Sequence, residues 1–211
     1  MAYKFASTPS HSYLQTALGN VPNWDATDYT TISLWVRTFG AVDWVAGLIG
    51  LQHVPDGSGR LNNYGLQIEN TGYNNRVRFW VTRDDTEFKI DSTFAWPHSD
   101  TSWHHVLAVA ARGHNTMYLS VDGAPMQSQA NVKWPETEKW FIRLSATGAA
   151  WNGLNGAIAE VGIWDYALLT IPGFRERDVA ALAAGVAPRL VQPNHLLAYW
   201  PLLWHSASEV G

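Results

Sequence analysis

The feature that most limits the fold of this chain is a series of short hydrophobic runs that alternate with other residues. Within residues 31–37, Ile32, Leu34 and Val36 fall on one face of an extended strand, and residues 76–82 repeat the pattern. Such period-two alternation is typical of strands with one buried face. Turn-forming residues separate the runs: Gly19-Asn20, Gly57-Ser58-Gly59, Asn74-Asn75, Arg83-Asp84-Asp85 and Asp122-Gly123. Evenly spaced short strands favour a β-sandwich or a barrel.

A hairpin is predicted in the middle of the chain. Its strands are residues 103–111 and 115–121, and Arg112-Gly113-His114 forms the turn between them. The second strand ends in Asp122-Gly123, which is a strong turn signal. A further strand is expected at residues 157–164, where apolar and β-branched residues again predominate.

Only one helix is predicted. Residues 174–184 contain good helix formers, and Val179 and Leu182 recur at helical spacing. Gly185 is a suitable C-cap, and Pro188 blocks further extension of the helix.

The chain of 211 residues has no sharp internal boundary and no repeat, so a single domain is expected over residues 1–211. In chain order, we expect a β-sandwich core over residues 1–169, a short helix over 174–185, an edge strand over 196–202 and a loose tail over 205–211.

Composition excludes several classes of function. The net charge is −4 and only 15% of the residues are charged, so the chain lacks the basic face that nucleic acids or anionic membranes require. No stretch approaches the roughly 18 apolar residues of a membrane span. The absence of cysteine excludes disulfides, thiol catalysis and zinc-thiolate sites.

The cellular location is constrained only indirectly. Residues 1–15 lack the apolar stretch of a secretory signal. Two explanations are open: a signal has been removed, or the protein leaves its cell by another route such as host lysis. In either case we expect the protein at a virion surface or outside the cell.

Several segments follow one another in a characteristic order: YTTISLWV at 29–36, WHHV at 103–106, YLSVDG at 118–123, GAIAEVGIWDYAL at 156–168 and LAAG at 182–185. In these segments the chain resembles the laminin-G-like, concanavalin A-like jelly-roll superfamily, which includes pentraxins and many lectin modules. The resemblance implies an all-β fold, an antiparallel two-sheet β-sandwich of jelly-roll type with one short helix. It says little about function, because the fold hosts many roles.

Two departures from the family pattern matter. Ala159 stands where the family often has an aspartate that supports a calcium ion, so calcium binding is not implied at this position. The segment 197–202 resembles the strand that usually begins such a domain, yet here it stands near the end of the chain. We infer a circularly permuted edge strand, which either completes its own sandwich or reaches into a neighbouring subunit.

The carboxylates do not form a catalytic pattern. Glycoside hydrolases on this fold place paired carboxylates on one strand, and retaining chemistry needs them about 5–5.5 Å apart. Glu160 and Asp165 face opposite sides of a regular strand, while Glu87 and Asp91 lie beside a turn without a third partner. We therefore expect a protein that is not an enzyme.

The adjacent histidines His104 and His105 do not form a metal site, because neighbouring residues on a strand point to opposite faces. We expect one of them to be buried and hydrogen-bonded and the other to be exposed.

No cofactor or metal is expected, with one exception: the sequence is compatible with a calcium site. Asp84 and Asp85 lie close to Glu87 and Asp91, and calcium takes six to eight oxygen ligands from such loops. Asn152 offers a further oxygen. The alternative is a solvated hairpin turn, for which this sequence is well suited.

The tryptophans are the most unusual part of the composition, with 12 in the chain. Those within strand patterns are expected to be structural: Trp35, Trp80, Trp103, Trp164 and Trp200. Those in loops or at strand ends are candidates for glycan or partner binding, because sandwich loops carry most binding residues. The candidates are Trp96, Trp134, Trp140 and Trp151, together with Asn152. Each loop tryptophan has three alternative roles: it packs in the core, binds a glycan or contacts a protein partner.

Two functions follow. The first is a non-catalytic structural protein of a virus particle, a phage capsid decoration protein or fibre component that forms a homo-oligomer or contacts other virion proteins. The missing signal, the absence of cysteine and the relocated edge strand favour it, and Tyr199, Trp200 and Trp204 would then make assembly contacts. The alternative is an extracellular carbohydrate-binding module, with glycan binding that depends on Trp96 and Trp151. Neither involves nucleic acid or membrane insertion.

Overall fold

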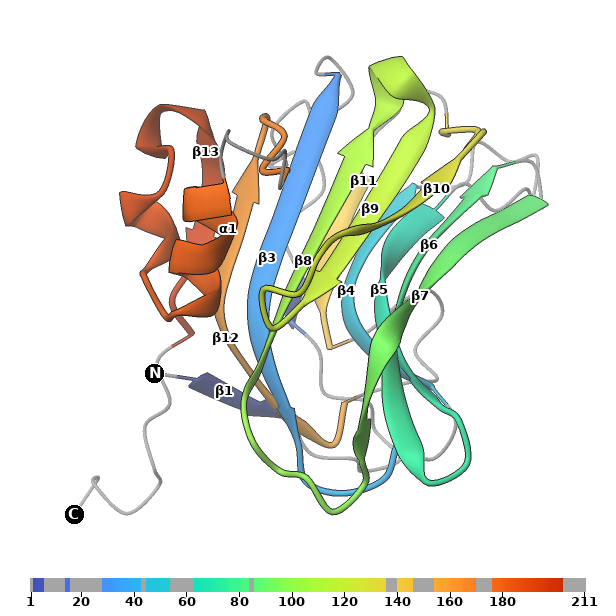
Figure 1. Cartoon of the computed structure of the whole chain (residues 1–211), viewed down its shortest axis with the longest axis vertical. Coiled ribbons are helices and arrows are strands. Elements are labelled where there is room, and N and C mark those ends of the chain that lie inside the picture. Colours follow the sequence, from blue (N-terminus) through green and yellow to red (C-terminus); the bar gives the residue numbers. More distant parts are fainter. Residues whose placement is uncertain are drawn as a thin grey trace.

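The structure is a computed structural model of the chain, and it describes residues 2–5, 14–15, 28–42, 45–53, 63–83, 86–135, 140–145, 154–169 and 176–202. Two antiparallel sheets face each other, with the helical segments on one side (Figure 1). This is the predicted jelly-roll sandwich.

The first sheet contains β1 (Ala2–Phe5), β12 (Gly156–Trp164), β3 (Tyr29–Thr38), β8 (His104–Ala111), β9 (Thr116–Val121) and β10 (Gln127–Ala130) in that order, and β13 (Leu196–Trp200) also pairs with β12. The second sheet contains β2 (Leu14–Gln15), β11 (Trp140–Leu144), β4 (Val45–His53), β5 (Asn63–Asn70), β6 (Asn74–Arg83) and β7 (Thr86–Pro97). We call them the seven-stranded and the six-stranded sheet.

The core fills the space between the two sheets. Ile32, Leu34 and Val36 of β3 are buried, and so are the alternate residues Val77 and Phe79 of β6. The alternation in the sequence therefore predicted both the strands and the side of each strand that faces inward.

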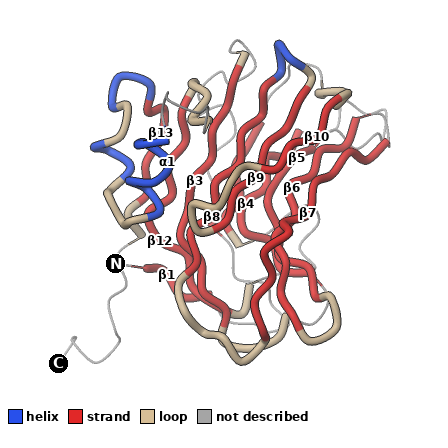
Figure 2. The backbone as a smooth tube through the Cα atoms, viewed as in Figure 1, coloured by secondary structure: helices blue, strands red, loops and turns tan. Residues whose placement is uncertain are grey.

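The outer face of the seven-stranded sheet is partly covered by helix α1 (Glu176–Ala183) and by the 3₁₀ turns η3 (Pro188–Leu190) and η4 (Pro193–His195). Val179 and Leu182 of α1 pack with Leu107 and Val109 of β8. In Figure 2 these helical segments lie beside β12 and β13. A further 3₁₀ turn, η2 (Arg112–His114), lies elsewhere, at the tip of the β8–β9 hairpin. The described helices include none that is long and apolar enough to cross a membrane.

Helix α1 ends at Ala183, one residue before the predicted end, and residues 174 and 175 of the predicted span lie outside the described residues. Gly185 follows with a φ of 87°, which is the left-handed conformation expected of a C-cap glycine. The predicted hairpin is confirmed, with η2 as its turn.

The edge of the seven-stranded sheet is built from both ends of the chain. β1 pairs with the first half of β12, from Gly156 to Ala159, and β13 pairs with the second half, from Val161 to Trp164. Between them, Glu160 has a φ of 51° and lies in an irregular part of the β12–β3 ladder. β13 thus completes the sheet of its own chain, which is the first of the two alternatives that the sequence left open.

Candidate functional site

Two of the predicted binding tryptophans lie in the interior. Trp96 is 1% exposed, and its ring stacks on His104 with 4.4 Å between the ring centroids. Trp134 is 6% exposed, with its ring 6.5 Å from that of Phe79. Their burial places both indoles in the core, so neither presents a face for a sugar to stack on.

The other predicted residues divide into two groups. Trp140 is the first residue of β11, but its side chain lies outside the described part of the structure. The positions of Asp84, Asp85, Trp151, Asn152 and Trp204 also lie outside the described residues. Their predicted roles in glycan, calcium or partner binding therefore stay predictions.

Tyr199 and Trp200, which were predicted to make assembly contacts, lie in β13. Trp200 is partly buried and packs against the main core. The Tyr199 hydroxyl donates a hydrogen bond to Glu160 Oε2 at 2.5 Å. Burial and this carboxylate raise the pKa of Tyr199 to about 12. Both side chains therefore make contacts within their own subunit.

Both histidines of the WHHV segment are buried, so the prediction that one of them would be exposed is wrong. They do point to different sides: His104 stacks on Trp96, whereas His105 lies 5.4 Å from the ring of Trp35 and bonds to Ser33 Oγ. The aromatic ring of Trp35 shields His105 on the side that a bare sheet would expose. Burial lowers the pKa of His105 to about 4.

The most ligand-like surface in the described structure is instead the outer face of β5, β6 and β7. β6 turns Val77, Phe79 and Val81 inward, and these three are buried. The intervening residues Arg76, Arg78, Trp80 and Thr82 therefore point to the opposite face, and all four are partly exposed. We refer to this surface as the β5–β7 face.

The cross-strand neighbours of Trp80 on the β5 side are glycines, which have no side chains to cover the indole. Trp80 pairs with Gly65 of β5, which in turn pairs with Gly50 of β4. On its other side Trp80 pairs with Lys89 of β7. The indole thus has glycine on one flank and a flexible, exposed lysine on the other.

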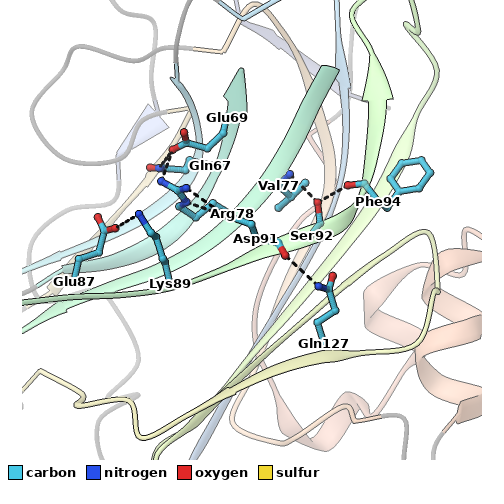
Figure 3. A network of polar contacts seen from close by, with 10 residues as sticks. All are labelled: Gln67, Glu69, Val77, Arg78, Glu87, Lys89, Asp91, Ser92, Phe94 and Gln127. Atoms are coloured by element: carbon cyan, nitrogen blue, oxygen red, sulfur yellow. Dashed lines mark hydrogen bonds and ion pairs between the residues drawn. The ribbon is translucent and has the colours of Figure 1, made fainter. Parts of the chain in front are cut away.

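Arg78 precedes Trp80 by two positions on the same face of β6. It is the centre of a network of charged side chains across β5, β6 and β7 (Figure 3). The Arg78 guanidinium donates to both Asp91 oxygens, with Nε–Oδ1 at 2.6 Å and Nη2–Oδ2 at 3.0 Å. Its Nη1 donates to Glu69 Oε1 at 3.0 Å, and the Gln67 amide donates to the same oxygen at 2.6 Å. The side chains of Arg78 and Glu69 are only 18% and 14% exposed, so these bonds are partly shielded from water.

The electrostatic consequence is a fixed, ionised set of groups. The hydrogen bond from Arg78 lowers the pKa of Asp91, and its charge acts in the same direction. Asp91 in turn raises the pKa of Arg78. A bidentate arginine–carboxylate pair is among the strongest and most directional of protein hydrogen bonds.

The backbone that carries Asp91 is held from the opposite sheet (Figure 3). Gln127 of β10 donates from Nε2 to the Asp91 carbonyl at 3.1 Å and accepts from the Thr93 amide at 2.7 Å. Ser92 Oγ accepts from the Val77 amide and donates to the Phe94 carbonyl. These bonds fix β7 where its pairing with β6 shifts in register.

The carboxylates that suggested calcium are paired with cations where the structure describes them. Asp91 binds Arg78, and Glu87 lies 3.0 Å from Lys89. Across the described ranges, no group of three or more histidine, aspartate and glutamate side chains is arranged to hold a metal ion.

The sequence analysis counted Trp80 among the structural tryptophans and so missed this surface, although the sequence contained a signal for it. The alternation in residues 76–82 places Trp80 with Arg76 and Arg78, opposite the apolar residues. A tryptophan on the polar face of a strand is a better binding candidate than one near a strand end. The network of Arg78 with Glu69 was not predictable, because it depends on the register between β5 and β6.

Comparison with known proteins agrees with this architecture. Residues 8–170 match the family described as the Concanavalin A-like lectin/glucanases superfamily. No curated protein matches the chain by sequence.

Solved structures with similar folds come from several settings. A heptameric SAP-like pentraxin from Limulus polyphemus is 14% identical, with a TM-score of 0.62 over 86% of this chain and 80% of that chain. The CBM40 domain of a Ruminococcus gnavus IT-sialidase bound to α2,3-sialyllactose is 14% identical, with a TM-score of 0.56 over 81% and 98%. The enzymatically active domain of tailspike protein 2 from bacteriophage CBA120 is 13% identical, with a TM-score of 0.62 over 91% of this chain but 28% of that one. At these identities, the likeness shows the fold alone.

Proposed function

Because the chain belongs to the Concanavalin A-like lectin/glucanases superfamily, we propose that it is a non-catalytic glycan-binding protein that uses the β5–β7 face. The family match agrees with the resemblance seen in the sequence. The observation that carries the proposal is the partly exposed indole of Trp80 beside the ordered network of Arg78, Glu69 and Asp91.

This combination suits a sugar. An aromatic face packs against the apolar side of a pyranose ring, and a few fixed polar groups around it bind the hydroxyls. Glu69 and Asp91 are hydrogen-bond acceptors whose positions Arg78 already fixes. A ligand that donates hydroxyl hydrogens to them pays little ordering cost, because the groups are preorganised.

The electrostatics favour binding over hydrolysis. A glycosidase needs a carboxylic acid whose pKa is raised so that it can protonate the leaving oxygen. Arg78 has the opposite effect on Asp91, because it lowers the pKa of that carboxyl. The other carboxylate of the network, Glu69, accepts hydrogen bonds from Arg78 and Gln67 through Oε1.

We further propose that the protein works at a virion surface, as a capsid decoration protein or fibre component, or otherwise outside the cell. The likeness to a bacteriophage tailspike supports the virion setting. The heptameric pentraxin supports a homo-oligomer. Sedimentation of the full chain tests the second point: a discrete oligomer is expected, and a monomer at every concentration would contradict it.

A glycan array with the purified full chain tests the main proposal. It is run with calcium and again with a chelator. Saturable binding to a defined set of glycans is expected, and silence in both conditions would refute the lectin function. Loss of binding with the chelator would assign a role to calcium, for which Asp84, Asp85 and Asn152 are the candidate ligands.

A further inference from the structure

One cation of the β5–β7 face has no partner. Within the described residues, Arg76 forms no hydrogen bond or ion pair, and its Nε is buried without an acceptor. Glu69 lies directly across from Arg76 in the ladder, but Glu69 Oε1 is engaged by Arg78 and Gln67. On the other side Arg76 faces Ala95, which offers no acceptor.

Arg76 Nε is one of nine buried side-chain nitrogen and oxygen atoms without a hydrogen-bond partner in the described structure, and it is the one that belongs to a cation of the β5–β7 face. Buried polar groups are usually hydrogen-bonded. A guanidinium binds a carboxylate or a sulfate through parallel hydrogen bonds, and its planar fork selects such groups over neutral ones. The unpartnered state of Arg76 therefore points to an anionic ligand group. Its position beside the Asp91–Arg78 pair is reflected in its effect on Asp91, because its charge helps to lower the pKa of that carboxyl.

The distance between Arg76 and Trp80 defines how such a ligand lies. Both residues point outward from β6, four positions apart, which corresponds to about 13 Å along a strand. Arg78 and its two carboxylates lie between them. A ligand that stacks on Trp80 and reaches Arg76 must therefore follow β6 and contain more than a single sugar ring.

We propose that the β5–β7 face selects anionic oligosaccharides, with one sugar stacked on Trp80 and the carboxylate or sulfate of another bound by Arg76. This inference rests on the proposed glycan-binding function and adds its specificity. The Arg78 network binds hydroxyls in the middle of the site, and Arg76 distinguishes an acidic glycan from its neutral counterpart.

The test compares matched glycans by calorimetry on the full chain. The probes are 3′-sialyllactose with lactose, a uronate oligosaccharide with its carboxyl-reduced form, and a sulfated oligosaccharide with its desulfated form. The wild type should bind the acidic member of at least one pair about tenfold more tightly. The pair that responds identifies the source of the anionic group.

The variant Arg76→Gln should remove this preference, so that the acidic and the neutral member bind with similar affinity. Arg76→Lys should restore only part of it, because lysine keeps the charge and loses the planar fork. The matched control is Arg177→Gln, which makes the same charge change at an exposed position on α1 and should bind like the wild type. Thermal unfolding of each variant shows that its fold is intact.

The outcomes separate the two proposals. Equal affinity for acidic and neutral members in the wild type, or a preference that survives in Arg76→Gln, would overturn the role of Arg76 while the lectin function stands. Failure of every acidic and neutral glycan to bind would refute the lectin function itself, and the specificity with it.

Discussion

Individual tryptophans of this chain have opposite roles that follow from the face of the strand they occupy. Trp80 and Trp96 lie on neighbouring strands of one sheet, yet Trp80 points outward and Trp96 points into the core. Whether a tryptophan lies near a loop in the sequence does not show which of the two is exposed and which is buried. The alternation of the flanking apolar residues does so for Trp80, because Phe79 and Val81 occupy the opposite face.

The first prediction contrasts these two residues. Trp80→Ala should leave the fold intact and weaken glycan binding at least about tenfold, since a stacked aromatic contributes on the order of 1 kcal/mol or more beyond burial. Trp96→Ala should destabilise the protein by about 3–5 kcal/mol, as expected for a large buried side chain. Urea unfolding and glycan titration of both variants measure the two effects. A Trp80→Ala protein that binds like the wild type would exclude this indole from the site.

The second prediction concerns His105, whose pKa is lowered from 6.5 to about 4 by burial. The unfolded chain binds a proton below pH 6.5 and the folded chain does not, so folding stability is complete above pH 6.5 and falls as the pH approaches 4. The pKa difference corresponds to a loss of about 3 kcal/mol. Unfolding midpoints at pH 7, 6 and 5 test this.

The control for this prediction is His105→Gln, which cannot titrate and keeps a polar group near Ser33 Oγ. Its midpoint should change less than that of the wild type over the same pH range. Parallel pH profiles for the two proteins would mean that His105 does not cause the loss.

At the scale of single elements, the strands and the β8–β9 hairpin were predictable, whereas the irregular part of β12 was not. The spans 31–37, 76–82 and 196–200 were expected as strands, because short-range alternation reports which side chains are buried. The positive φ of Glu160 had no such signal. Glu160 lies between the part of β12 that pairs with β1 and the part that pairs with β13, two strands from opposite ends of the chain.

The same reasoning explains what could be foreseen of the site. Trp80 and Arg76 were recognisable as outward-facing from their own strand. The pairing of Arg78 with Asp91 required the register of β6 with β7, which shifts by a bulge between Arg76 and Arg78. The alternation within β6 does not show where the ladder is interrupted, so this shift could not be predicted from the strand's own sequence.

The third prediction concerns β13. Leu197 and Trp200 pack against the main core, and the strand pairs with β12. Deletion of residues 196–211 should therefore lower the free energy of unfolding by at least about 3 kcal/mol, given the apolar area that those two side chains bury. Deletion of residues 203–211 alone, as the matched control, should have a much smaller effect.

Chemical denaturation of both truncations at several protein concentrations measures this. If deletion of residues 196–211 left the midpoint unchanged, β13 would not stabilise its own sandwich. A midpoint of the full chain that rises with protein concentration would instead indicate stabilisation by contacts between subunits, the arrangement expected of a homo-oligomer.

At the scale of the whole molecule, the outer faces of the two sheets differ. Helix α1 and the turns η3 and η4 lie against the seven-stranded sheet (Figure 1). Val179 and Leu182 of α1 pack there with Leu107 and Val109. The β5–β7 face of the six-stranded sheet presents Trp80 and a charged network instead. The helical side is thus fixed by hydrophobic packing, while the β5–β7 face keeps its polar groups at the surface.

This asymmetry leads to the last prediction. A bound glycan should slow hydrogen exchange of amides in β5, β6 and β7, because the ligand contacts side chains that these strands carry. A bound ligand also stabilises the whole protein against unfolding, by about 2.7 kcal/mol at a ligand concentration of 100 times Kd. Apart from the uniform decrease in exchange rate that this causes, amides of α1 and of the β8–β9 hairpin should exchange as they do without ligand. The Trp80→Ala variant under the same conditions shows which protection needs the site. Local protection centred on α1 or the β8–β9 hairpin would place the glycan on the opposite side of the sandwich and reject the β5–β7 face.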